Sequence, residues 1–192
     1  MNTTALQQPT KRQRTEALQA SVQSAQYLTF MLAGETFAVG ILAVKEIIEY
    51  RGLTEVPMMP VHVRGVINLR GAVVPVMDLL MRFGRAPSPV GKRTCIVILE
   101  IESEQERQVI GVVVDAVNEV LDIGASEIEP PPAFGARIRS DFIEGMGKVR
   151  DKFVILLDVN QMLSVGEAAQ MTRQAESASS GPETSGRALT GE

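Results

Sequence analysis

Apolar and polar residues alternate along much of the chain, which predicts β-strands. Between residues 64 and 79, two apolar β-branched runs flank Arg70 and Gly71, and glycine supplies the positive φ of a tight turn. Asp78 follows, and there the apolar period changes from two to 3.6, so its side chain can accept hydrogen bonds from the first turn of a helix. The stretch predicts a hairpin that presents an arginine, and then a short capped helix.

The preceding residues predict another hairpin. Residues 27–32 and 36–41 have the alternation of strands, and Gly34 with Glu35 forms the turn between them. Residues 43–50 fit a strand or a short helix. Two prolines make the segment 56–60 irregular, because proline lacks the amide donor that a sheet requires.

The same pattern starts again at Cys95. Residues 37–57 align with residues 110–130 at one offset (110 − 37 = 73), and residues 65–78 align with residues 145–158 at another (145 − 65 = 80). The seven extra residues fall in a loop between the two aligned segments. A unit of about five short strands and a terminal helical turn therefore occurs twice.

The repeat predicts two similar β-barrels, since short strands with frequent glycine and proline turns favour closure. The first barrel is expected at about 26–85 and the second at about 94–164, with exchange of strands between them left open. Residues 1–25 have the composition of a disordered arm, and residues 165–192 that of a low-complexity tail.

Composition narrows the function classes. An apolar fraction of 45% in 192 residues allows a packed core, and no apolar run is long enough to span a bilayer. The first 25 residues are too polar for a secretory signal, so we expect a cytoplasmic protein without direct membrane insertion. The net charge of −4, the absence of Trp and the presence of only two Tyr argue against nucleic acid as a partner.

The sequence offers little for catalysis. One cysteine and one histidine cannot form a Cys/His metal cage, so no metal site is expected. His62 lies in a loop without a nucleophile motif nearby, and a surface histidine is the simpler interpretation. Glu46 and Glu119 occupy matched positions of the two units and could form an acid/base pair, although solvated ends of equivalent strands explain them better. No phosphate-binding loop has the required spacing, so no catalytic or cofactor-binding residue is predicted.

The differences between the two units single out Arg70. Its turn contains Gly71, whereas the turn of the second unit has Asp151 after Arg150, so only the first has a glycine to fix how its arginine is aimed. Arg70 is therefore a candidate recognition residue. The alternative is an arginine that packs its stem on the barrel and keeps its head in water.

Four segments together resemble the CheW-like family of chemotaxis coupling proteins: 37–47, 64–79, 110–121 and 130–134. The resemblance covers about residues 26–164. It implies an all-β fold of two similar five-stranded SH3-like β-barrels packed side by side, with short helical turns after each barrel and disordered termini. Kinases of the CheA type and CheV proteins carry the same fold, but this chain has no room for a kinase core and its tail is not a receiver domain.

The resemblance also implies a function. It indicates a non-catalytic adaptor, without cofactor, that joins the cytoplasmic tip of methyl-accepting chemoreceptors to the regulatory domain of the histidine kinase CheA. The free protein would be a monomer, recruited from the cytoplasm to membrane-associated receptor arrays. Carried over by motif, the receptor-binding positions would be Val44, Glu46, Arg70, Cys95 and Val120.

Two further positions would bind the kinase. Gly65 matches a family position whose alteration weakens kinase binding, and Phe134 matches an aromatic in a second kinase contact that closes rings in receptor arrays. Glu129 and Ala133 depart from the family pattern at that second contact, where we expect a basic and an acidic residue. Two alternatives stay open: an adaptor of another chemosensory-type pathway that governs twitching motility or second-messenger synthesis, and an enzyme that uses Glu46 with Glu119 or uses His62.

Overall fold

The computed structural model describes residues 24–103, 106–131, 138–150 and 152–163. The predicted tail, 165–192, lies outside these residues, as does Phe134. Of the predicted arm, residues 1–23 lie outside them, whereas Ser24 and Ala25 already belong to the first strand. None of the described helices is both long and apolar enough to cross a membrane.

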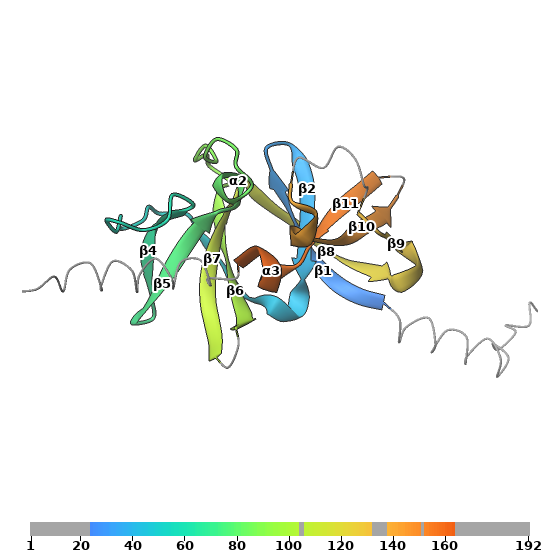
Figure 1. Cartoon of the computed structure of the whole chain (residues 1–192), viewed down its shortest axis with the longest axis horizontal. Helices are drawn as coiled ribbons and strands as arrows, with labels where there is room; N and C mark the ends of the chain where they lie inside the picture. The colour runs from blue at the N-terminus through green and yellow to red at the C-terminus, as the bar shows by residue number, and fades with distance from the viewer. Residues whose placement is uncertain (1–23, 104–105, 132–137, 151, 164–192) are drawn as a thin grey trace, which may run out of the picture.

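Strands dominate the described chain, and short helices or 3₁₀ turns occupy the connections (Figure 1). The strands are β1 (Ser24–Leu32), β2 (Glu35–Gly40), β3 (Val44–Glu49), β4 (Val63–Leu69), β5 (Ala72–Asp78), β6 (Cys95–Ser103), β7 (Glu106–Val114), β8 (Ala116–Gly124), β9 (Ile128–Glu129), β10 (Ile143–Val149) and β11 (Lys152–Leu157). The α-helices are α2 (Leu79–Arg82) and α3 (Val159–Leu163), and the 3₁₀ turns are η1 (Ile41–Ala43), η2 (Ala125–Glu127) and η3 (Ser140–Phe142). Residues 43–50, which fitted a strand or a helix, are mainly the strand β3.

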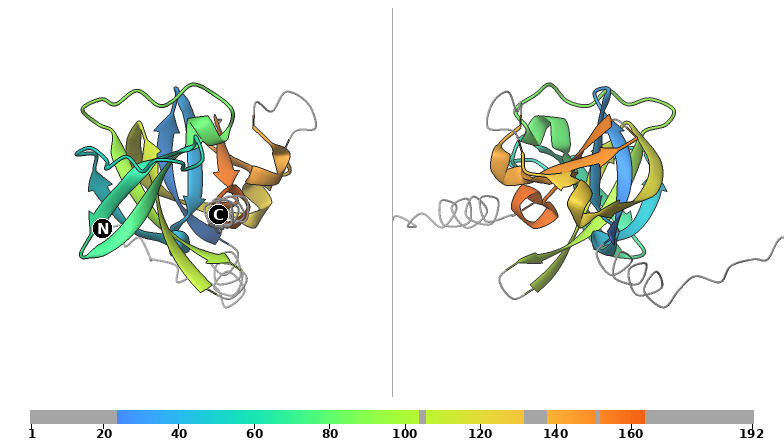
Figure 2. Two further views of the ribbon diagram at one scale, coloured as in Figure 1. Left: turned by 60° about the vertical axis from the view of Figure 1, so that its left-hand side comes forward. Right: turned by 90° about the vertical axis from the view of Figure 1, so that its right-hand side faces the viewer.

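The strands form two barrel-like sheets that stand side by side, as the views in Figures 1 and 2 agree. One sheet has the order β8-β1-β2-β11-β10-β9 and the other has the order β3-β6-β7-β5-β4. The prediction of an all-β fold with two similar barrels and a short helix after each unit is confirmed. The larger sheet counts six strands because the two-residue strand β9 pairs with β10, whereas a single bridge between Thr54 and Val66 holds the matching place in the smaller sheet.

The division of the chain at residues 85–94 separates the two repeats but not the two sheets. The hairpin β1–β2 of the first repeat lies in the sheet of the second, and β6–β7 of the second repeat lies in the sheet of the first. Two parallel pairings, β2 with β11 and β5 with β7, join the repeats within each sheet. Each barrel is therefore built from both halves of the chain, so neither 26–85 nor 94–164 is a barrel by itself.

Apolar and polar residues alternate along the strands, and the apolar side chains form three buried clusters. On β6, Val97 and Leu99 point into the largest cluster, which draws residues from both sheets, whereas Ile96 and Ile98 point into the interior of the smaller sheet. Tyr27 belongs to the third cluster, inside the larger sheet, and its burial, together with the charge and hydrogen bond of Glu144, raises the pKa of Tyr27 to about 12. Because the largest cluster lies between the sheets, the two barrels share one core.

The two short helices complete this shared core. Leu79 and Leu80 of α2 and Met162 and Leu163 of α3 are buried in it. Arg82 Nε donates a hydrogen bond to the Met162 carbonyl at 3.1 Å, which ties the end of one repeat to the end of the other. Figure 1 shows α3 in the seam between the sheets.

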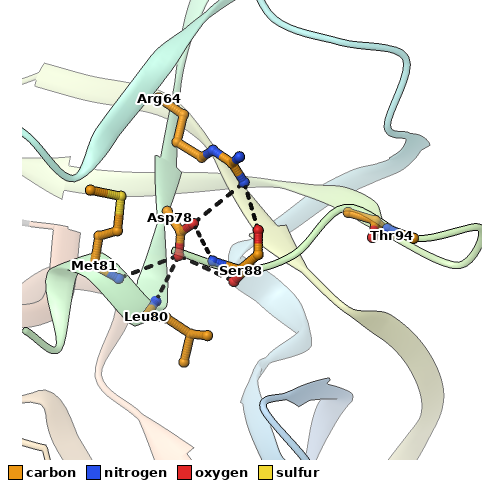
Figure 3. A network of polar contacts seen from close by, with 7 residues as sticks. Arg64, Asp78, Leu80, Met81, Ser88 and Thr94 are labelled. Atoms are coloured by element: carbon orange, nitrogen blue, oxygen red, sulfur yellow. Dashed lines mark hydrogen bonds and ion pairs between the residues drawn. The ribbon is translucent and has the colours of Figure 1, made fainter. Parts of the chain in front are cut away.

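Asp78 caps α2, as the sequence predicts, and its carboxylate also contacts Arg64 and Ser88 (Figure 3). Its side chain is fully buried, and its Oδ1 accepts hydrogen bonds from the amides of Leu80 and Met81 and from the Ser88 hydroxyl, at 2.9, 3.3 and 3.2 Å. Its Oδ2 accepts from the Ser88 amide at 2.8 Å and faces Arg64 Nη1 at 3.4 Å. The carboxylate thus joins a strand, a helix and the loop that follows.

Asp158, the matched residue of the second repeat, has a simpler environment. It caps α3 by accepting a hydrogen bond from the Gln161 amide at 3.0 Å, as expected from its alignment with Asp78 at the offset of 80 (158 − 78 = 80). The backbone repeats as well: the Asp78 amide donates to the His62 carbonyl, and the Asp158 amide donates to the Phe142 carbonyl. Among the contacts of the described residues, the Asp78 side chain has several donors around it, whereas Asp158 has this one cap.

Candidate functional site

The turn between β4 and β5 presents Arg70 to solvent. Arg70 has a φ of 53° and Gly71 a φ of 92°, so both central residues are left-handed, as in a type I′ hairpin turn. The Asn68 Oδ1 accepts a hydrogen bond from the Gly71 amide at 2.8 Å, which holds the turn in this form. The turn fixes the position from which the arginine extends.

Arg70 forms an ion pair with Glu46 of β3. Its Nη2 lies 2.8 Å from Glu46 Oε2, while the side chains of Arg70 and Glu46 are 80% and 26% exposed. Such exposed pairs typically contribute between zero and about 1 kcal/mol to stability, so the fold does not depend on this one. Both charged groups are therefore accessible to a partner that offers better-placed groups.

The pair connects the two outer strands of its sheet, since β3 begins and β4 ends the strand order. Between these edges lies a cavity of about 750 Å³. Apolar side chains and the charged residues Glu49 and Arg51 contribute to its lining: Ile48, Glu49, Arg51, Gly52, Leu53, Thr54, Val66, Ile67, Asn68 and Ile96. The Glu46–Arg70 pair and the Thr54–Val66 bridge are polar contacts that help to close this side of the barrel.

The other predicted receptor positions are divided between the two sheets. Val44 opens β3, two residues before Glu46, and packs partly against the shared core. Cys95 opens β6 opposite Glu49, also packs against that core, and donates through its thiol to the Arg93 carbonyl at 3.2 Å. Val120 is 45% exposed on β8, in the other sheet. The structure therefore places Val44, Glu46 and Arg70 in one region of the smaller sheet, with Cys95 on the neighbouring strand, and Val120 on the other sheet.

Gly65, predicted to bind the kinase, has a structural reason to be glycine. Its φ is 151°, and a Cβ at this position would lie 2.4 Å from the Thr54 carbonyl oxygen. The close approach permits the bridge in which the Thr54 and Val66 backbones exchange hydrogen bonds of 3.0 and 2.8 Å. Gly65 is buried, so any influence on a partner acts through the segment that it holds.

The second predicted kinase contact is only partly described. Phe134 and Ala133 lie outside the described residues, and Glu129 is an exposed residue of β9 that pairs with Met146. This contact stays a prediction.

The sequence comparison was wrong on one point about the second turn. Arg150 has a φ of 46°, close to that of Arg70, although no glycine follows it. The left-handed conformation of the arginine is therefore common to both repeats. What distinguishes Arg70 is its carboxylate partner and not its backbone.

Glu46 and Glu119, considered as an acid/base pair, have different partners in the structure, and His62 lies in a loop. Glu46 pairs with Arg70, whereas Glu119, on the other sheet, exchanges backbone hydrogen bonds with the Thr29 hydroxyl. The His62 carbonyl, in the loop before β4, accepts a hydrogen bond from the Asp78 amide. Within the described part of the chain, no three His, Cys, Asp or Glu residues are grouped as metal ligands.

Comparison with known proteins places this geometry in a family. The model of the CheW-like domain matches residues 26–167, which include all the described strands from β2 onward and most of β1. The chain belongs to the CheW-like domain family.

Relatives of this CheW-like domain share about a third of its sequence. The chemotaxis protein CheW of Klebsiella aerogenes is 32% identical over 152 residues, which cover 79% of this chain and 89% of that protein. The scaffolding protein TtCheW from Thermoanaerobacter tengcongensis has a crystal structure that superposes with a TM-score of 0.66. Its sequence is 36% identical, and the match covers 74% of this chain and 90% of the TtCheW chain. Protein PilI of Pseudomonas aeruginosa is 32% identical over 84 residues, covering 44% of this chain and 47% of PilI.

The structure also shows large exposed apolar side chains in the first repeat. Leu42 is 99% exposed on η1, where the CheW-like domain crosses from one sheet to the other, two residues before Val44. Met58 and Val61 are 90% and 78% exposed in the loop that follows the Thr54 bridge, and Val73 is exposed on β5. Leu42 gave no signal because it stands in a continuous apolar run, whereas prolines on both sides of Met58 marked an irregular segment.

Proposed function

We propose that this protein is a non-catalytic adaptor that couples methyl-accepting chemoreceptors to the histidine kinase CheA. Membership of the CheW-like family supports this proposal, as does the likeness to a structure described as a scaffolding protein. A domain with two barrels around one core presents separate surfaces at a fixed distance, which suits a protein that holds two partners in register. A receptor's conformational change can then bias the kinase between states.

The exposed Glu46–Arg70 pair is the observation that carries the receptor side of the proposal. Its groups are ordered by a hydrogen-bonded turn yet contribute little to stability. The planar guanidinium offers a donor fork to carboxylates and carbonyls, and the exposed Leu42 and half-buried Val44 provide apolar surface beside Glu46 in the sequence. A polar anchor with apolar neighbours is typical of a site that docks another protein.

The kinase side of the proposal rests on the loop that Gly65 positions. Beyond the Thr54 bridge, Val56, Met58 and Val61 expose apolar side chains at the end of the smaller sheet. Exposed apolar residues that gather in one loop favour a protein contact over solvent. We assign this loop to the regulatory domain of the kinase, whereas Phe134 would serve a second kinase contact.

Replacing Arg70 with alanine tests the receptor contact. We expect the variant to fold normally and to lose about tenfold or more in affinity for a receptor cytoplasmic fragment, because a charge-assisted contact is removed. Calorimetric titration of the purified proteins measures the loss. Arg107→Ala is the matched control, since Arg107 is also exposed and ion-paired on the same sheet, to Glu100. Equal receptor affinity of the two variants would reject Arg70 as a contact.

A second candidate is an adaptor of another chemosensory-type pathway, for example one that governs twitching motility or second-messenger synthesis. The match to PilI supports it, although that match covers less than half of either chain. Both candidates place the protein in the cytoplasm, at membrane-associated receptor arrays, and neither requires catalysis. The receptor that binds at Arg70 distinguishes them.

A further inference from the structure

The hairpin tip between β10 and β11 carries a cluster of positive charge. Lys148, Arg150 and Lys152 are all exposed there, within five residues of sequence. Lys148 stands directly opposite Phe153, whose side chain is 53% exposed. Because cross-strand partners point to the same face of a sheet, the lysine and the aromatic ring form one surface. We call Lys148, Arg150, Lys152 and Phe153 the basic tip.

The basic tip differs from most of the cationic surface of the described chain. Seven other described cations form ion pairs with carboxylates: Lys45, Arg51, Arg64, Arg70, Arg85, Arg107 and Arg139. In the described part of the chain, none of the three cations of the basic tip is ion-paired. The acidic residue of β10, Glu144, accepts instead a hydrogen bond from the Tyr27 hydroxyl at 3.2 Å.

The repeat makes the contrast sharper. Arg70 and Arg150 are matched residues with nearly the same φ, of 53° and 46°. Arg70 has the carboxylate of Glu46 at 2.8 Å, but the matched Glu119 is not ion-paired with Arg150 in the described structure. The second repeat therefore holds its arginine in the same backbone conformation without an internal carboxylate.

We propose that the basic tip binds a carboxylate-rich surface of a protein in the signalling complex, at a contact separate from that of Arg70. The proposal rests on the adaptor function proposed above. Arginine and lysine side chains form charge-assisted hydrogen bonds with carboxylates, and Phe153 adds an apolar contact that an acidic protein surface can cover. The pairing of β10 with β11 orders the backbone that carries these groups, which limits the entropy lost on binding.

The charge of the basic tip argues against a membrane as the partner. The sequence places Asp151 among the three cations, so the net charge is +2. Attraction to anionic lipids is worth only about 1 kcal/mol per basic residue, and lipid-binding segments usually carry at least about four of them. Nucleic acid is also disfavoured, because the chain has a net charge of −4.

A triple variant, Lys148→Gln, Arg150→Gln and Lys152→Gln, tests the proposal. Titrated onto a complex reconstituted from a receptor fragment and the kinase, it should bind about tenfold more weakly than wild type, and its affinity should fall less steeply with salt. Lys92→Gln with Arg93→Gln is the control, since these exposed cations also lack an ion pair in the described structure and lie away from the hairpin. Urea unfolding should give the same stability for all three proteins.

The outcomes separate the two proposals. If the wild-type protein binds neither partner, the adaptor function itself is wrong. If wild type binds and the triple variant matches it in affinity and salt dependence, the basic tip has no such contact. A third arm uses sedimentation with phosphatidylserine vesicles: binding that depends on the tip, with unchanged affinity for the proteins, would assign the tip to lipid and overturn the proposal.

Discussion

Asp78→Asn is expected to lower the free energy of unfolding by about 3–5 kcal/mol, because it removes the charge from a fully buried, hydrogen-bonded carboxylate. Both carboxylate oxygens act as acceptors in this site. An asparagine amide nitrogen would face either the Ser88 amide and Arg64, or the amides of the first turn of α2, and all of these are donors. No orientation of the amide satisfies both sides. Urea denaturation followed by circular dichroism measures the loss.

Asp158→Asn is the matched control for this variant. Asp158 occupies the equivalent place in the second repeat, but its described side-chain bond is a single cap to the Gln161 amide. Asparagine caps helices nearly as well as aspartate, so we expect a loss below about 0.5 kcal/mol. Equal losses in the two variants would show that the cluster around Asp78 contributes no more than an ordinary cap.

Gly65→Ala is expected to destabilise the protein by about 2–4 kcal/mol, through backbone strain and overpacking. The φ of 151° is unfavourable for alanine, and the new Cβ would meet a backbone oxygen at 2.4 Å, which a side-chain rotation cannot relieve. The segment around Thr54 must therefore move. We expect the folded variant to bind the kinase regulatory domain at least about fivefold more weakly while its receptor affinity stays unchanged, because the displaced segment leads into the exposed apolar loop.

Gly40→Ala provides the control for backbone flexibility. Gly40 has an ordinary φ of −55°, and a Cβ there would meet nothing within 4 Å, so its stability should change by less than about 1 kcal/mol. Stability is read from urea unfolding and kinase affinity from calorimetric titration. A Gly65→Ala protein that keeps wild-type stability and kinase affinity would refute the structural role of this glycine.

Local features of the fold could be predicted from the sequence. The hairpin turn at Arg70 and the caps at Asp78 and Asp158 depend on residues close in the chain, and all three occur as predicted. The repeat also predicted matching strands: β4 and β10 coincide at the offset of 80 (143 − 63 = 80). Turn and cap chemistry acts over a few residues, which is why one sequence suffices.

Pairing between distant strands could not be predicted in this way. The parallel register of Ile155 with Phe37 joins residues more than a hundred positions apart, and nothing in the periodicity of either strand selects its neighbour. The repeat left exchange of strands between the two barrels open for this reason, and the structure shows that the strands are exchanged. The exchanged strands bring Phe37 and its neighbours into the shared core.

The residues of the candidate site could be predicted from the sequence, but the contacts between them could not. Arg70 came first from the comparison of the two repeats, and Glu46 as its companion came from the resemblance to a family. Their ion pair depends on closure of the sheet between its two outer strands. The partners of the buried Asp78 carboxylate, which are Arg64 and Ser88, were missed, because hydrogen bonds over such separations leave no periodic signal. The role of Gly65 was expected as a contact, and the structure gives it a backbone reason instead.

The most direct test of the adaptor function is sedimentation of three purified proteins together: this chain, a receptor cytoplasmic fragment and the kinase regulatory domain. We expect one species that contains all three proteins. When Arg70 is replaced by alanine, this species should lose the receptor and keep the kinase. Separate sedimentation of the three proteins, or binding of receptor and kinase that is mutually exclusive, would contradict it.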